Sequence, residues 1–401
     1  MRTRESFRAR FRRPFGSDWF LPCLPGARFA RTRLPSVSPS GRIIAAVVCL
    51  LALASILAAE AGPAPVAPDL LTTRVISLDG TWRLAPDPQN AGRDQKWYLA
   101  PRNEAKETKV PWIIQDAFPD YHGVAWYWRE FTPPANPHAG GRCLLRFWSV
   151  DYAAEVWLNG VRIGQHEDGE EPFTFDVTDA VRADRPNLLA VRVLNPTNEP
   201  IDGITLNHTP HGIKVMPYQA GRNWNKGGIC DSVELILAPR ARVEDVFVRG
   251  DWKSGQVRIQ ADVRNDAGKD VPAKLDFVIA PARSGSTVAS ARLERTLAPG
   301  LTRVETTLRV PDHRLWELND PQLYRVSLRV AEEGSASCDE RSLRFGFRDF
   351  RFERGYFRLN GRRIYLRCSH TTNCCPVGLE MPHDPDLLRR DLLNVKVMGF
   401  N

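Results

Sequence analysis

The chain has 401 residues, of which 43% are hydrophobic and 25% are charged. This length suits two or three domains, and this apolar fraction excludes a chain that is disordered over most of its length. The formal net charge of +8 lies in residues 1–42, where ten arginines face Glu5 and Asp18. The rest of the chain carries 45 basic and 45 acidic side chains, so we expect no nucleic-acid partner.

Residues 43–59 form an uncharged apolar run behind Arg42, and Ala59-Glu60-Ala61 follows as a small-residue cleavage motif. This pattern predicts a secretory signal at about residues 43–61, within an Arg-rich leader that covers residues 1–61. The run is close to the shortest length that spans a membrane, so an uncleaved anchor stays open as an alternative. We therefore expect a secreted or periplasmic protein, which contacts a membrane only if the leader is retained.

The eight cysteines indicate neither a disulfide scaffold nor a metal site. Cys23 and Cys49 lie in the leader, and the six others are sparse apart from the adjacent pair Cys374 and Cys375. A bond between neighbouring cysteines is strained, and no paired C-x-x-C spacing suggests zinc. We expect free thiols, no metal and no cofactor.

Residues 70–240 show the pattern of a first all-β domain. Apolar and polar side chains alternate over residues 145–149, 154–159 and 173–177, with turns about every ten residues, as in strands with one buried face. Asn159-Gly160 separates two apolar segments and predicts a tight hairpin turn. Many short strands of this kind indicate a β-sandwich, here a jelly roll.

Residues 241–344 repeat the alternation in longer strands, over about a hundred residues. This pattern predicts an immunoglobulin-like sandwich, although the two cysteines of an antibody-type disulfide are absent. The simplest role for such a unit is that of a spacer that orients its neighbours.

Residues 345–401 show a mixed pattern of strands and a helix, unlike the two all-β regions before them. Asn360-Gly361 predicts a second hairpin, and residues 364–368 are expected to form a strand. Asp384-Pro385 starts a helix whose apolar face is formed by Leu388, Leu392 and Val395, and Gly399 ends it. One βα unit of this kind does not fold alone, and a (β/α)₈ barrel needs about 250 residues.

Several segments of the chain resemble glycoside hydrolase family 2, the β-galactosidase and β-glucuronidase group. They are WYWREFTPP (126–134), RFWSVDYAAEVWLNGVRIGQHEDGEEPFTFDVTD (146–179), NLLAVRVLN (187–195), GGICDSVEL (227–235), LWELNDPQLYRVSLRV (315–330) and the stretch from FGFRDF (345–350) to the final GFN. The resemblance covers residues 70–401. It implies a sugar-binding jelly roll, an immunoglobulin-like spacer and the first βα unit of a truncated (β/α)₈ barrel.

The resemblance also implies a retaining glycosidase, an enzyme that needs two carboxyl groups about 5–5.5 Å apart. In the family these are glutamates on later barrel strands, the acid/base following an asparagine. Asn198-Glu199 and Asn103-Glu104 fall in the sandwich region, so neither is expected to be catalytic. The catalytic glutamates are expected beyond Asn401, and the chain alone is expected to be inactive.

Substrate-lining residues are implied at three places. The loop after the first barrel strand holds His370 and Asn373, and the sandwich loops hold Asp120 and His122, and Trp224 and Asn225. Two other interpretations stay open: a non-catalytic carbohydrate-binding or surface protein, and an adhesin without sugar affinity. For the glycosidase and for the carbohydrate-binding protein, the expected partner is a carbohydrate. The sequence predicts neither the sugar nor the oligomeric state.

Overall fold

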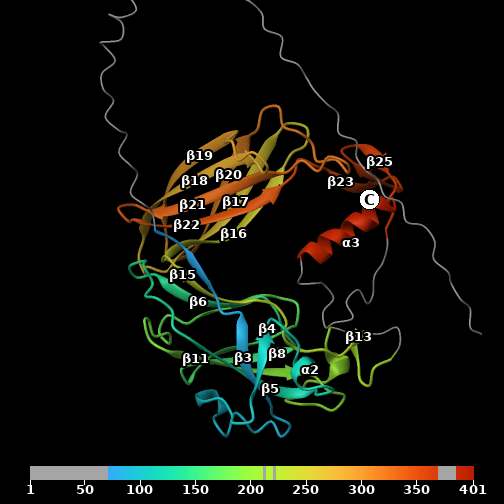
Figure 1. Ribbon diagram of the computed structural model, residues 1–401. Coiled ribbons are helices and arrows are strands. Elements are labelled where there is room, and N and C mark those ends of the chain that lie inside the picture. Colours follow the sequence, from blue (N-terminus) through green and yellow to red (C-terminus); the bar gives the residue numbers. More distant parts are fainter. Residues whose placement is uncertain (1–70, 211–213, 220–222, 369–384) are drawn as a thin grey trace, which may run out of the picture. The chain divides into compact units, whose positions relative to one another are not determined.

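The computed structural model describes residues 71–210, 214–219, 223–368 and 385–401. The chain is mainly β, as its alternation predicts, and its strands are gathered in several sheets (Figure 1). The leader, including the predicted signal at about residues 43–61, lies outside the described residues. Within the described residues no helix has the length and apolar character needed to cross a membrane.

The first sandwich consists of a six-stranded and a four-stranded sheet. The larger has the order β4-β3-β5-β11-β8-β9, formed by β3 (Gly80–Pro86), β4 (Lys106–Val110), β5 (Gly123–Phe131), β8 (Ala153–Leu158), β9 (Val161–Glu167) and β11 (Asn187–Asn195). The smaller has the order β10-β6-β15-β2, formed by β2 (Arg74–Ser77), β6 (Arg142–Phe147), β10 (Phe173–Asp176) and β15 (Val233–Ala238). Alternate side chains of both sheets meet in one core, which includes Trp82, Tyr127, Phe147, Val191 and Leu235.

The six-stranded sheet also has an apolar layer on its other face. Trp126, Trp128 and Trp157 are buried there together with Trp97, which belongs to the short helix η1 (Trp97–Leu99). The indole N–H of Trp126 donates to Asp87 Oδ2 at 3.0 Å, and that of Trp128 donates to the Trp97 carbonyl at 2.8 Å. Six consecutive residues of β5 are therefore buried, and the alternation expected of a half-exposed strand is absent from it.

The predicted hairpin at Asn159-Gly160 is confirmed. Asn159 (φ 54°) and Gly160 (φ 83°) both adopt positive φ between β8 and β9, as this turn type requires. The Asn159 side chain also donates to the Ala180 carbonyl at 2.8 Å and accepts the Leu188 N–H at 3.0 Å. The turn is thus bonded to two other segments of the sandwich.

We expect Gly160→Ala to destabilise the protein by about 1–2 kcal/mol, because an L-residue in the left-handed region is strained by that amount. The added Cβ would also lie 2.8 Å from Leu99 Cδ2. Gly285→Ala is the matched control, since Gly285 has a similar φ of 71° with no atom within 4 Å of the added Cβ. Urea denaturation should show the larger loss for Gly160; equal losses would mean that the Leu99 contact costs nothing.

The second sandwich packs two sheets around a second core (Figure 1). One has the order β16-β17-β20, formed by β16 (Ala241–Gly250), β17 (Gln256–Asn265) and β20 (Gly300–Arg309). The other has the order β22-β21-β18-β19, formed by β18 (Val271–Pro281), β19 (Ala289–Leu297), β21 (Tyr324–Glu332) and β22 (Ser337–Phe345). The short strand β1 (Leu71–Thr72) pairs in parallel with β22, so the beginning of the described chain joins this sheet.

The hairpin predicted at Asn360-Gly361 is also confirmed. It joins β24 (Tyr356–Leu359) to β25 (Arg362–Ile364), beside β23 (Phe350–Glu353), with φ of 51° at Asn360 and 78° at Gly361. The Asn360 side chain is buried, accepts the Asp349 N–H at 3.0 Å and donates to the Trp316 carbonyl at 3.0 Å.

The strand expected over residues 364–368 is not observed, because β25 ends at Ile364 and residues 365–368 have no regular structure. A strand needs a neighbour to satisfy its backbone groups. None of the described residues pairs with this segment in a ladder, and Tyr365 is 79% exposed.

The predicted helix is present as α3 (Pro385–Val397), and Gly399 follows it with φ 89°. The Gly399 N–H donates to the Lys396 carbonyl at 3.0 Å, which closes the last turn. On the predicted apolar face, Leu392 is 61% exposed, whereas Leu388 and Val395 are half-buried.

Candidate functional site

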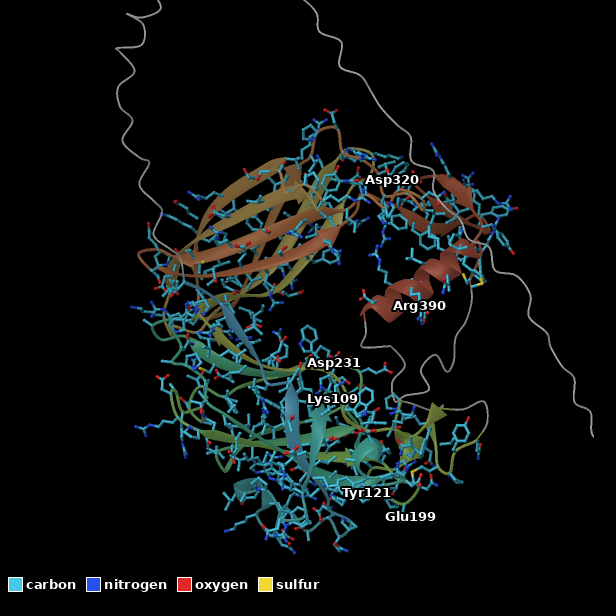
Figure 2. All side chains as sticks on the ribbon, viewed as in Figure 1. Lys109, Tyr121, Glu199, Asp231, Asp320 and Arg390 are labelled. Carbon is cyan, nitrogen blue, oxygen red and sulfur yellow. The ribbon has the colours of Figure 1, made fainter. Side chains whose placement is uncertain are left out.

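Three loop segments of the first sandwich come together at one site. They are the short helix α2 (Ile114–Ala117) with the loop that leads into β5, the end of β11, and the segment formed by β12 (Lys214–Val215), β13 (Asn223–Trp224) and β14 (Gly228–Ile229). The strand β14 pairs with β7 (Val150–Asp151), and a short helix, η2 (Leu206–His208), follows the β11 loop. Figure 2 shows Tyr121, the neighbour of His122, at this end of the sandwich.

Three of the predicted site residues are brought together here. The rings of His122 and Trp224 lie 6.4 Å apart between centroids, tilted by 57°. His122 Nδ1 lies 3.5 Å from the Asn225 side-chain nitrogen. His122 and Trp224 are half-buried, so each offers part of its ring to a ligand.

A network of buried amides supports these residues. Asn195, at the end of β11, donates to Asn225 Oδ1 at 2.9 Å, and its own Oδ1 accepts from Gln115 Nε2 at 2.9 Å. Asn195 Oδ1 also lies 3.0 Å from His122 Nδ1. Gln115 and Asn195 were not predicted as site residues; a polar residue that ends the apolar strand NLLAVRVLN is the one signal that could have marked Asn195.

The electrostatics of the site favour a neutral His122. Burial lowers the pKa of His122, and this outweighs the hydrogen bond to Asn195 and the charge of Asp120, both of which raise it. At neutral pH the ring is therefore uncharged, with one nitrogen that donates and one that accepts.

The other predicted site residues differ in their surroundings. Asp120 is exposed, with φ 59°, and acts on His122 through its charge. Asn225 is fully buried and its amide bonds to other residues of the protein, so its contact with a ligand stays a prediction. His370 and Asn373 lie outside the described residues, as do Cys374 and Cys375.

A cleft of about 440 Å³ opens beside His122. Its other polar lining residues include Asp87, Asn90, Tyr121 and Asp202. One wall is braced by Arg192, which is only 3% exposed and donates to Asp202 Oδ2 at 2.6 Å and to Glu155 Oε1 at 2.9 Å. Hydrogen-bonding side chains thus form much of the lining of the cleft, and groups of this kind fix the orientation of a bound ligand.

The two Asn-Glu dipeptides both lie in loops of the first sandwich, as predicted. Glu104 is in the turn before β4, and Glu199 is on the loop after β11, labelled in Figure 2. Among the residues that the structure describes, no group of three or more His, Cys, Asp or Glu side chains could hold a metal ion. The four cysteines that are described, Cys143, Cys230, Cys338 and Cys368, are free thiols.

Two family models match the chain in succession. The sugar binding domain of glycosyl hydrolases family 2 matches residues 75–239, and a second model of glycosyl hydrolases family 2 matches residues 241–348. The chain belongs to glycosyl hydrolases family 2. The resemblance stated from the sequence motifs is thereby confirmed.

Similar proteins in this family are glycosidases. A β-glucuronidase from Paenibacillus borealis is 28% identical over 75% of this chain and 49% of its own length, and the β-glucuronidase of Canis lupus familiaris is 27% identical over 72% and 47%. A β-galactosidase from Aeromonas hydrophila is 25% identical over 83% of this chain and 34% of its own length. The chain thus spans half or less of the length of these relatives.

A solved structure, the β-glucuronidase of Lactobacillus rhamnosus, matches the fold with a TM-score of 0.66 and 22% identity. The match covers 84% of this chain and 55% of that structure.

Proposed function

We propose that this chain is the N-terminal portion of a retaining glycoside hydrolase that acts on β-glucuronides or β-galactosides. The observation that carries this proposal is the succession of the two family 2 models over residues 75–239 and 241–348. The names of the relatives, β-glucuronidase and β-galactosidase, support the class of substrate. In this proposal the first sandwich binds sugar, the second is the spacer, and residues 345–401 begin a catalytic barrel.

In the proposed reaction one carboxylic acid protonates the leaving oxygen while a second carboxylate attacks the anomeric carbon. Water then hydrolyses the glycosyl-enzyme, and the first group acts as base. We place both carboxylates beyond Asn401. This placement is supported by the loop positions of Glu104 and Glu199 and by the share of the relatives, half or less, that the chain spans.

Within the part described, the proposed contribution is to substrate binding. The exposed part of the Trp224 ring offers a flat apolar surface, and the faces of sugar rings stack on such surfaces. His122 offers a hydrogen-bonding nitrogen beside it. His370 and Asn373 are proposed to complete this lining, and the leader is proposed to direct the protein to the periplasm or the cell exterior.

Residues 62–401, expressed alone, are expected to give no turnover of aryl β-glucuronides or aryl β-galactosides, because the two carboxylates are missing. A protein extended by the in-frame codons that follow residue 401 should hydrolyse at least one of the two. Turnover by residues 62–401 that survives removal of host enzymes would contradict the expectation. If the Glu199→Gln variant then lost this turnover, catalysis would be assigned to Glu199.

The second candidate, a carbohydrate-binding module without catalysis, is favoured by the polar cleft and the ring pair at the site. A stop codon directly after codon 401, together with measurable affinity for a methyl glycoside, would support it over the enzyme.

A further inference from the structure

The orientation of the Gln115 side chain is determined by backbone groups at both ends of its amide. The Gly227 N–H can only donate, and it lies 3.3 Å from Gln115 Oε1. The Tyr121 carbonyl can only accept, and it lies 2.8 Å from Gln115 Nε2. Gln115 Nε2 is therefore the nitrogen, and its second hydrogen points to Asn195 Oδ1 at 2.9 Å.

The same reasoning determines the other two amides. Asn225 Nδ2 lies 2.5 Å from the Pro196 carbonyl, which identifies it as the nitrogen. Asn225 Oδ1 then accepts from Asn195 Nδ2 at 2.9 Å, which places the oxygen of Asn195 toward Gln115. All three amides have one consistent orientation, and backbone groups at Gly227, Tyr121 and Pro196 set it.

His122 Nδ1 lies 3.0 Å from Asn195 Oδ1, an atom that only accepts. Nδ1 must therefore carry a hydrogen, since a bare Nδ1 would place two lone pairs against each other. Asn225 Nδ2 is the competing partner, but it lies 3.5 Å away, and its two hydrogens have other acceptors in the Pro196 carbonyl, at 2.5 Å, and Met216 Sδ, at 3.4 Å. In the neutral ring the hydrogen is then absent from Nε2, which becomes an acceptor.

We propose that Asn195 is a positioning residue that holds His122 in the Nδ1–H form and so presents Nε2 as an acceptor for a hydroxyl group of the ligand. Among the described residues no partner is found for Nε2, and His122 lines the 440 Å³ cleft. That the hydroxyl belongs to a sugar rests on the proposed function. A fixed acceptor selects ligands that donate at this point and disfavours those that present an ether or carbonyl oxygen.

The neutral state of His122 is part of this arrangement, because a protonated ring has no acceptor nitrogen. Among the described residues, Asp120 on its own loop acts on the ring through its charge, and the titratable groups that line the cleft with His122 are Asp87, Tyr121 and Asp202. Burial keeps the pKa of His122 below its ordinary value in spite of Asp120. The acceptor is therefore available at neutral pH and is lost as the pH falls through that pKa.

The test is nitrogen NMR of the full chain, labelled with ¹⁵N-histidine, with the His122 signals assigned from a His122→Gln variant. At pH 7.5 we expect the shift of a protonated nitrogen at Nδ1 and of a bare nitrogen at Nε2. Asn195→Asp should raise the pKa of His122, because a carboxylate then faces Nδ1, and Nε2 should remain protonated to higher pH. Asn207→Asp, which adds the same charge at an exposed position of η2, is the control and should leave the His122 titration unchanged.

The ligand role is tested by titrating methyl β-glucuronide and methyl β-galactoside into the same sample. A shift of the Nε2 signal with either glycoside would support it. An Nε2–H ring in the unmodified chain, or equal titration shifts in the two aspartate variants, would overturn the positioning role whatever the sugar result. A bare Nε2 that neither glycoside perturbs would overturn the ligand role and count against sugar binding at this site.

Discussion

Trp126→Ala is expected to lower the free energy of unfolding by about 3–5 kcal/mol, the range for truncating a fully buried aromatic side chain. The Trp126 ring lies 5.1 Å from that of Trp157 and 6.4 Å from those of Trp97 and Trp128, between centroids. The variant leaves a cavity among them and removes the hydrogen bond to Asp87, whose carboxylate stays buried. Chemical denaturation followed by circular dichroism measures the loss.

Trp148→Ala is the matched control, because Trp148 is 40% exposed and the guanidinium of Arg146 lies 5.4 Å from its ring. It removes the same number of atoms from the same sandwich. Its effect should be within about 1 kcal/mol, as for most surface substitutions. Similar losses in the two variants would show that the aromatic layer over the six-stranded sheet contributes little.

Arg192→Ala is expected to lower the free energy of unfolding by about 1–3 kcal/mol, the range for leaving buried hydrogen-bonding groups without a partner. The substitution removes the buried donor of Glu155 and Asn90. Glu155 keeps the more exposed Arg93, at 3.3 Å, and Asp202 keeps the same arginine, at 2.6 Å. Thermal unfolding measures the effect. Arg329→Ala is the control, since its ion pair with Glu340 on the surface of the second sandwich is exposed and worth little. Equal stability of both variants would contradict the assigned role of Arg192.

The same network predicts a dependence of stability on pH. Burial alone would raise the pKa of Asp202, but the charge of Arg192 and the hydrogen bonds from Arg93 and Asn90 outweigh it and lower the pKa. A carboxylate with a lowered pKa stabilises the fold above its unfolded pKa, and this contribution is lost as the pH falls through the folded pKa. Arg192→Ala should therefore flatten the acid limb of the stability profile.

Features set by neighbouring residues could be predicted from the sequence. Asn159-Gly160 and Asn360-Gly361 form the expected turns because positive φ is a property of the dipeptide itself. Helix α3 follows from its spacing of leucines. The strand expected after Ile364 is absent because a strand depends on a partner, which no local pattern supplies.

The candidate site was predictable only in part. His122 and Trp224 could be nominated because the family resemblance points to their loops. Gln115 and Asn195 could not, because their hydrogen bond joins residues 80 positions apart and exists only once α2 has packed against the end of β11. The segment over Trp126 was missed for the same reason: residues 87–105 show no periodicity, and their role appears only in contact with the sheet.

Because β5 is buried on both faces, its alignment with the neighbouring strands is selected differently from that of a half-exposed strand. In a strand with one apolar face, a shift by one residue exposes the core side chains to water, and this penalty selects the correct alignment. In β5, residues 123–128 are buried on both sides, so that penalty is largely absent. Alignment must then be selected by directional contacts: the indole N–H groups of Trp126 and Trp128 reach their acceptors in one alignment only. Gly92 allows the covering backbone to approach, since a Cβ there would lie 2.4 Å from Trp126 Nε1.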